Sequence, residues 1–130
     1  MSKRPRQNFS SGAPLEPVVG YSRAVRVGDR VLVAGTAATW PDGSVNLEPK
    51  AQAERCLEII LAALDEAGAG PQAVVRTRIY ITDVEYAEVV GKAHGAVFGE
   101  IRPASSMVVV SALLDPRWKV EIEAEAVISG

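Results

Sequence analysis

The chain has 130 residues, of which 48% are hydrophobic and 23% are charged, and this length suits one domain rather than two separate cores. Its formal net charge of −2 lacks the basic excess of a nucleic-acid-binding surface, so nucleic acid is not an expected partner. No apolar run approaches the ~20 residues that span a bilayer, and the N-terminus has no signal-like apolar segment, so we expect a cytoplasmic protein that does not enter membranes.

The N-terminal segment 1–16 is polar, includes two prolines and shows no hydrophobic period, so it is interpreted as a flexible lead-in. A single domain is expected to occupy 17–130. Within it, the pattern predicts two short strands joined by a tight Gly-Asp turn, Tyr21–Val27 and Val31–Gly35. Residues 38–48 are rich in turn-forming residues and predict a loop.

The clearest helix is predicted for Pro49–Ala67, because proline suits the first helical position. Apolar residues recur along it at steps of three and four and give one helix face an apolar stripe, namely Ala53, Leu57, Ile60, Leu61 and Leu64. Cys56 lies beside this stripe and is interpreted as a small buried hydrophobe. As the single cysteine of the chain, it excludes an intramolecular disulfide and a cysteine-based zinc cluster.

A third strand is predicted for Val74–Thr82, followed by a second helix over 84–99 that Asp83 caps. The strand has one face of Val75, Thr77, Ile79 and Ile81 and another of Arg76, Arg78 and Tyr80. His94 falls next to the inner stripe of the second helix and is interpreted as a structural residue, because no second histidine supports a ligand role. We expect no metal and no cofactor, although spacing alone leaves an oxygen-only metal site open.

Two further strands are predicted at Ser106–Leu113 and Trp118–Ile128. The last one alternates strictly, with apolar residues on one face and Glu121, Glu123 and Glu125 on the other. The order ββαβαββ predicts an α+β fold, with one mixed sheet that carries both helices on one face.

The face of the sheet that two helices leave uncovered is expected to mix charged and apolar residues. By the period-two rule it carries Arg76, Arg78, Tyr80, the three glutamates of the last strand, Met107, Val109 and Val127. Opposite charges on adjacent strands are favourable neighbours. Two interpretations stay open, a solvated face or an interface between subunits.

Two motifs point to a known family. The run Arg102–Met107, followed by Lys119–Ala124, resembles the C-terminal signature of the Rid family, also called YjgF, which includes the reactive-intermediate (enamine/imine) deaminases. The resemblance extends back through Val75–Asp83 and Val33–Gly35 and covers roughly residues 20–129. It implies a chorismate-mutase-like fold, a homotrimer, and small-molecule clefts between adjacent subunits.

The chain departs from the family pattern at three positions. Deaminating members read Pro-Ala-Arg-Ser, and the arginine grips the substrate carboxylate; here the corresponding residue is Ser105. A hydroxyl cannot supply the charged, bidentate fork of a guanidinium. Met107 stands where many relatives carry a cysteine, and Gly91 stands where an asparagine is common on the second helix.

Other features of the signature are retained. The resemblance implies that Glu121 orients or activates the attacking water. It also implies that Tyr21 lies near the pocket entrance and that Gly35 and Thr36 help to line the cleft. The full candidate set is Glu121 as the catalytic residue and Tyr21, Gly35, Thr36, Ser105, Ser106, Met107 and Trp118 as substrate-binding residues.

Two of these roles have alternatives. Glu121 could instead be a sheet-face carboxylate paired with Arg76 or Arg78, since ion-pair networks resemble active sites. Arg23, Arg102 or Arg117 could replace the lost anchor from another direction.

The leading hypothesis is a homotrimer that binds a small metabolite between subunits, with deaminase activity lost or redirected because of Ser105. The alternative is an active hydrolase that uses Glu121 on an enamine, imine or related C–N substrate, with Ser105 or Ser106 as a hydrogen-bond donor. An action on RNA or on a partner protein comes third, because the acidic balance does not suit RNA. His94 is distant in sequence from Ser105, so no Ser-His-Asp arrangement is predicted.

Overall fold

The computed structural model describes residues 5–129, so the first four residues of the expected lead-in and Gly130 lie outside the described residues. The strands are β1 (Arg6–Phe9), β2 (Ala24–Val27), β3 (Arg30–Ala37), β4 (Val74–Ile81), β5 (Ala104–Val109) and β6 (Val120–Val127). The helices are α1 (Pro49–Glu66) and α2 (Ala87–Phe98), and shorter helical turns are η1 (Glu16–Gly20), η2 (Pro71–Ala73) and η3 (Val84–Tyr86).

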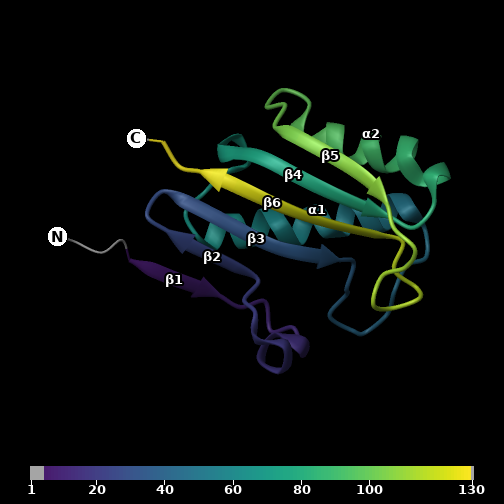
Figure 1. Cartoon of the computed structure of the whole chain (residues 1–130), viewed down its shortest axis with the longest axis horizontal. Helices are drawn as coiled ribbons and strands as arrows, with labels where there is room; N and C mark the ends of the chain where they lie inside the picture. The colour runs from purple at the N-terminus through teal and green to yellow at the C-terminus, as the bar shows by residue number, and fades with distance from the viewer. Residues whose placement is uncertain (1–4, 130) are drawn as a thin grey trace.

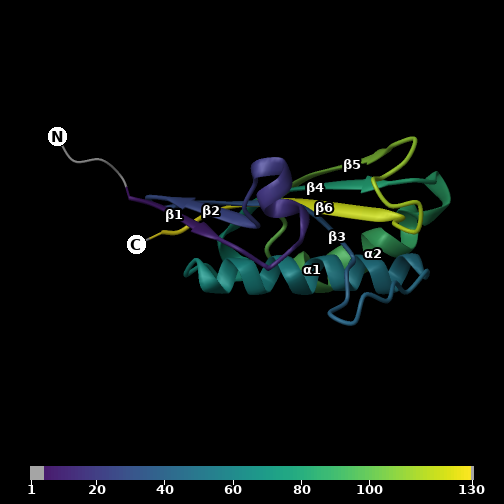
Figure 2. The ribbon, with the colours of Figure 1, turned by 90° about the horizontal axis from the view of Figure 1, so that it is seen from below.

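The six strands form one sheet in the order β1-β2-β3-β6-β4-β5. The β4–β5 pair is parallel and the other pairs are antiparallel, so the sheet is mixed. Both long helices pack on one face and leave the opposite face open (Figures 1 and 2). The predicted α+β architecture is therefore confirmed.

The N-terminal segment differs from the prediction. Residues Arg6–Phe9 pair in antiparallel register with β2, a strand that the interpretation of 1–16 as a flexible lead-in did not include. The strand is polar and lies at the sheet edge, where backbone hydrogen bonds, and not an apolar alternation, hold it. The sequence carries no periodic signal for such a strand.

Most other differences concern where elements begin and end. The predicted strand Ser106–Leu113 is shifted to Ala104–Val109, and the last strand begins at Val120 rather than Trp118. The predicted helix over 84–99 opens with a separate turn, η3, before α2 begins.

The core lies between the sheet and α1 and α2. It includes four of the five predicted stripe residues of α1, with Cys56 fully buried among them as expected, and Leu61 packs against it partly buried. Val75 was assigned to the core face, yet it is 47% exposed. The reason is a register shift of β4 against β6 between Val74 and Arg76, which turns Val75 outward.

The helix-covered face also includes residues of β5 that were predicted for the open face. Met107 pairs with the buried Ile79, and Val109 pairs with the buried Ile81. Paired residues on neighbouring strands point to the same side of a sheet. The assignment of Met107 and Val109 to the open face is therefore wrong, whereas that of Val127 is confirmed.

Candidate functional site

Glu121 lies half-buried on the open face of β6, between Ala37 of β3 and Tyr80 of β4. The register of β3 shifts between Val33 and Thr36, and Gly35 lies in this irregular stretch. A Cβ atom at Gly35 would lie 2.8 Å from Oε2 of Glu121. Glycine therefore leaves the space that the carboxylate occupies, which brings two of the predicted site residues together.

Arg23 holds three other predicted residues in the same cluster. Arg23 as a residue is only 7% exposed, and its Nη1 donates to the carbonyl of Gly35 at 2.8 Å and to Oγ1 of Thr36 at 3.0 Å. Nη2 donates to the hydroxyl of Tyr21 at 3.3 Å. A planar fork of several donors can join these groups where a lysine could not.

Thr36 itself is almost fully buried, and its hydroxyl also donates to the carbonyl of Ala34. It contributes to the cluster through Arg23 rather than through an exposed hydroxyl. Arg23 was predicted only as a possible substitute anchor, and its structural role was not predicted. The one feature of the sequence that could have indicated this role is that Arg23 directly precedes Ala24, a buried residue of β2.

The electrostatic setting of Glu121 favours proton uptake. Burial raises the pKa of its carboxyl group above the ordinary value, and the neighbouring charge of Glu123 raises the pKa further, whereas Arg23 opposes both effects. A carboxylate with a raised pKa is a better general base near neutral pH. The raised pKa therefore suits the Glu121 carboxylate to accept a proton from a bound water molecule or ligand.

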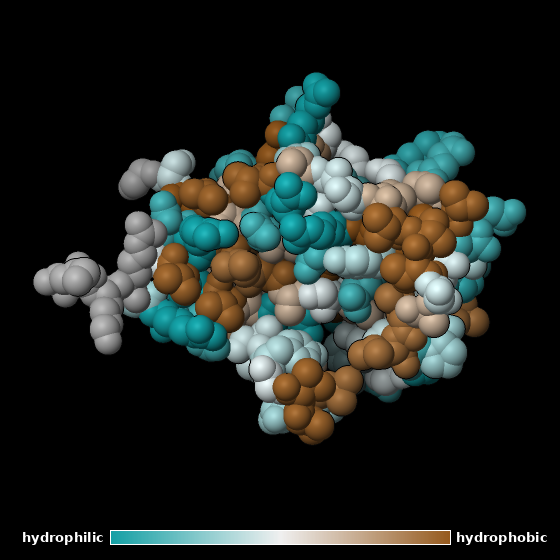
Figure 3. All heavy atoms as spheres, viewed as in Figure 1, coloured by the Kyte–Doolittle hydropathy of each residue, from teal (hydrophilic) through white to brown (hydrophobic). Residues whose placement is uncertain are grey.

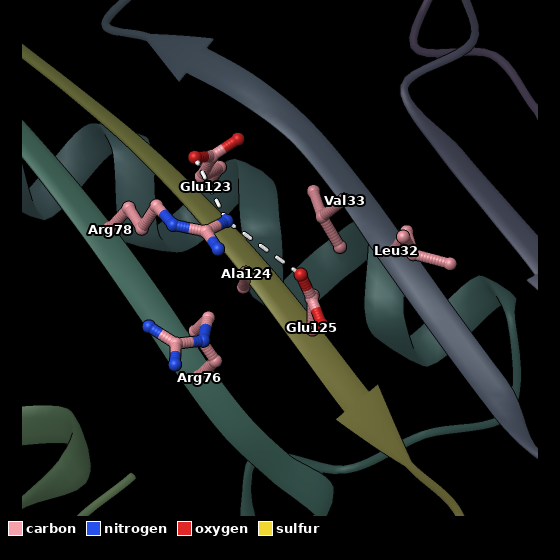
Figure 4. Close-up of a pocket in the computed structure, with 7 residues that line it drawn as sticks. All are labelled: Leu32, Val33, Arg76, Arg78, Glu123, Ala124 and Glu125. Atoms are coloured by element: carbon pink, nitrogen blue, oxygen red, sulfur yellow. Dashed lines mark hydrogen bonds and ion pairs between the residues drawn. The ribbon is translucent and has the colours of Figure 1, made fainter. Parts of the chain in front are cut away.

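Next to Glu121, charged residues of the open face form an ion-pair network (Figure 4). Nη1 of Arg78 lies 3.4 Å from Glu123 and 3.7 Å from Glu125, and the hydroxyl of Tyr80 donates to Glu123 at 2.6 Å. A shallow hollow of about 50 Å³ lies beside Arg76, Arg78, Glu123 and Glu125. Within residues 5–129 the ion pairs of Arg78 reach Glu123 and Glu125, and none joins Glu121 to Arg76 or Arg78.

Ser105 lies on the opposite face of the sheet. It pairs with Thr77 of β4, whose side chain is fully buried on the helix side. The Thr77 hydroxyl donates to Oγ of Ser105 at 2.8 Å and lies 2.8 Å from Nε2 of His94. Distance along the chain was therefore misleading, because Thr77 links Ser105 to His94 of α2.

Thr77 was not among the predicted site residues. It is a polar residue at a core-facing position between buried apolar ones, and buried polar side chains have hydrogen-bond partners. That pattern is visible in the sequence and could have identified it. The partner residues could not be identified in the same way, because they come from α2 and β5.

The remaining predicted residues are divided between the two faces. Ser106 pairs with Arg78 and shares the open face with Glu121. Met107 lies on the helix side, and its Cε is 4.0 Å from where a Cβ atom of Gly91 would lie. Trp118 is half-buried, and its indole Nε1 is buried without a hydrogen-bond partner among the described residues.

The loop that carries Trp118 is held by Gln52 of α1. The side chain of Gln52 is fully buried; it donates to the carbonyl of Arg117 and accepts from the backbone N–H of Lys119. These bonds fix the approach to β6 and hence the start of the strand that carries Glu121.

The other two arginines considered as anchors lie outside the Glu121 cluster. Arg117 makes a two-pronged contact with Asp115, and this contact lowers the pKa of Asp115 to about 2. Arg102 is exposed and has a positive φ of 57°. Arg23 is thus the one of the three that is bonded to predicted site residues.

Across residues 5–129, no three His, Cys, Asp or Glu side chains are grouped so that they could hold a metal ion. Among those residues, no helix has both the length and the apolar character to cross a bilayer.

Comparisons with known proteins match most of the chain. The sequence profile of the family described as Endoribonuclease L-PSP matches residues 11–128. The crystal structure of Rv2704 from Mycobacterium tuberculosis, a member of the YjgF/YER057c/UK114 family, is 47% identical in sequence, with a TM-score of 0.88. That match covers 95% of this chain and 100% of the mycobacterial one.

Two further relatives have names that refer to small molecules. A 2-iminobutanoate/2-iminopropanoate deaminase of Salmonella typhimurium is 33% identical, and the match covers 82% of this chain and 86% of the relative. The crystal structure of TdcF from E. coli with bound serine is 26% identical, has a TM-score of 0.80, and covers 94% of each chain.

Proposed function

The chain belongs to the endoribonuclease L-PSP family, also called the YjgF or Rid family, and we propose that it is a homotrimer that binds a small metabolite in clefts between adjacent subunits. One observation carries this proposal. Glu121 and Ser105 point to opposite faces of the sheet within one protomer. A single small ligand can contact both residues only if two different subunits supply them.

The open face supports self-association. Exposed apolar residues, Leu32, Val108 and Val127, lie there among the charged ones, and Figure 3 shows apolar and polar side chains interleaved over this face. Such a mixture suits a protein interface, whose composition is close to that of the general surface. A relative with bound serine supports a small ligand.

In this proposal the protein has either lost imine deaminase activity or hydrolyses a different C–N substrate. Ser105 stands at the position of the arginine that grips a substrate carboxylate in deaminating relatives, and a hydroxyl offers no charge to replace it. The specific observation that favours retained hydrolysis is the raised pKa of Glu121, which keeps a general base available. A redirected hydrolase would then act on a C–N substrate without a carboxylate at the Ser105 end.

Cross-linking between two differently substituted chains tests the shared cleft. Chains carrying Ser105→Cys are mixed and re-assembled with chains carrying Glu121→Cys, and a short bis-maleimide is added. We expect covalent heterodimers, because the two positions face one another across subunits. The natural Cys56 does not compete, since burial raises the pKa of its thiol to about 12. Ser44→Cys in place of Ser105→Cys is the control; heterodimers in equal amount with this control would refute the cleft.

An assay of imine hydrolysis tests whether the deaminase activity is lost. An amino-acid oxidase generates 2-iminopropionate, and ammonia release is followed with and without the protein. We expect no acceleration by the natural chain and a measurable gain in the Ser105→Arg variant. Acceleration by the natural chain that Glu121→Ala abolishes would show that imine hydrolysis is retained.

A further inference from the structure

The hydroxyl groups of Ser105 and Thr77 and the imidazole of His94 form a continuous hydrogen-bonded chain from α2 to the surface of β5. The Thr77 hydroxyl has one hydrogen, and it donates that hydrogen to Oγ of Ser105 at 2.8 Å. Nε2 of His94 lies 2.8 Å from the same Thr77 oxygen. With the Thr77 hydrogen directed to Ser105, Nε2 acts as the donor in the second bond, which corresponds to the Nε2–H tautomer of neutral His94.

The histidine ring is held firmly enough to keep this role. Its centroid lies 4.8 Å from that of Phe98, which is buried, and Thr77 is fully buried beneath it. Burial lowers the pKa of His94, so the ring is neutral around pH 7. Ser105, in contrast, is exposed.

The direction of these hydrogen bonds determines whether Ser105 donates or accepts toward a ligand. A serine hydroxyl that already accepts a bond from inside the protein has its own hydrogen free to donate outward. We propose that His94 and Thr77 are positioning residues that make Ser105 an outward hydrogen-bond donor, so that the site selects ligands with an uncharged acceptor oxygen, such as an amide or ketone carbonyl. The ligand class in this proposal rests on the proposed intersubunit cleft. The direction of the hydrogen bonds from His94 through Thr77 to Ser105 does not depend on that cleft.

Exclusion of charged groups follows from the same arrangement. An ammonium group has donors only and cannot accept the hydrogen that Ser105 directs outward. A carboxylate would lose its hydration without gaining the cationic partner that an arginine supplies, which is costly. An uncharged carbonyl oxygen needs one donor only and meets it at Ser105.

The first test needs no ligand, because the chain contains a single histidine. ¹⁵N-histidine labelling gives one pair of side-chain signals, from which the tautomer is read at mildly alkaline pH. We expect the Nε2–H tautomer in the natural protein. Ser105→Ala removes the acceptor, so the Thr77 hydroxyl turns to His94 and the population moves toward Nδ1–H. Ser106→Ala, on the same strand but the other face, leaves the signals unchanged. An Nδ1–H tautomer in the natural protein would reverse the chain and overturn the proposal.

The second test compares pyruvamide with pyruvate, which differ in charge at one end. NMR titration should show that the natural protein binds pyruvamide about 2- to 10-fold more tightly than pyruvate, the range that one hydrogen bond supports. Thr77→Val should reduce that preference, and Ser105→Arg should reverse it. A preference of the natural protein for pyruvate, or no binding of either compound, overturns the ligand class. Failure of the shared cleft is recognised separately, by the absence of cross-linked heterodimers.

Discussion

The carboxylate of Glu121 lies against the backbone of Gly35, so closely that a methyl group on residue 35 would stand 2.8 Å from Oε2. Real Cβ atoms do not approach an oxygen so closely, and one of the two groups must move. The group that can move is the carboxylate, because it is the free end of a flexible side chain. Glycine at position 35 is therefore needed for the Glu121 carboxylate to lie where it does.

Gly35→Ala should displace Glu121 with little loss of stability, at most about 1 kcal/mol. The ¹³C signal of the Glu121 carboxyl should move, and ligand binding at the cleft should weaken. Gly95→Ala is the matched control, because a Cβ atom there meets nothing within 4 Å. That variant should leave the Glu121 signal in place. An unchanged Glu121 signal in Gly35→Ala would contradict the geometry.

Glu123→Gln should lower the pKa of Glu121. The negative charge of Glu123 is one of the two causes that raise this pKa, and glutamine removes the charge but keeps an acceptor for Tyr80. A ¹³C titration of the Glu121 carboxyl should show its midpoint at lower pH, and any activity that needs ionised Glu121 should then extend further into the acid range. Glu125→Gln should shift the midpoint less. A midpoint that moves upward would disprove the assigned cause.

Arg23→Ala should destabilise the fold by ~2–4 kcal/mol, because it leaves the carbonyl of Gly35 and the hydroxyl of Thr36 without a charged donor in a buried setting. Arg23→Lys should recover part of this loss, since it keeps the charge but not the fork. Chemical denaturation measures both. Lys92→Ala, which removes an exposed helix pair with Glu88, should change little. Equal stability of Arg23→Ala and the natural chain would rule out this structural role.

The stability of the fold should depend on pH through His94. Burial lowers its pKa in the folded protein below the ordinary 6.5, so the unfolded chain binds the proton more readily between those two values. Stability from this group is therefore present above pH 6.5 and decreases as the pH falls toward the lowered value. Denaturant titrations at neutral and mildly acid pH should show a smaller decrease for His94→Gln than for the natural chain. Identical decreases in stability for the two proteins would count against a lowered pKa of His94 in the folded state.

The sequence alone predicted the helices and strands that depend on local residue patterns. The periodicity of α1 and the strict alternation of β6 predicted both elements and placed Glu121, Glu123 and Glu125 together on the open face. It was insufficient where non-local pairing decides. The side to which Met107 points depends on the parallel register of β5 against β4, and the outward turn of Val75 depends on a register shift. The link from His94 to Ser105 needed the packing of α2 on Thr77.

The proposed function depends most on a cleft that two subunits build together, and light scattering with size-exclusion chromatography tests this directly. At micromolar concentration the protein should elute as one species with three times the chain mass of 13.8 kDa. A stable species of 13.8 kDa would leave Glu121 and Ser105 on opposite sides of an isolated sheet, and no shared site could form.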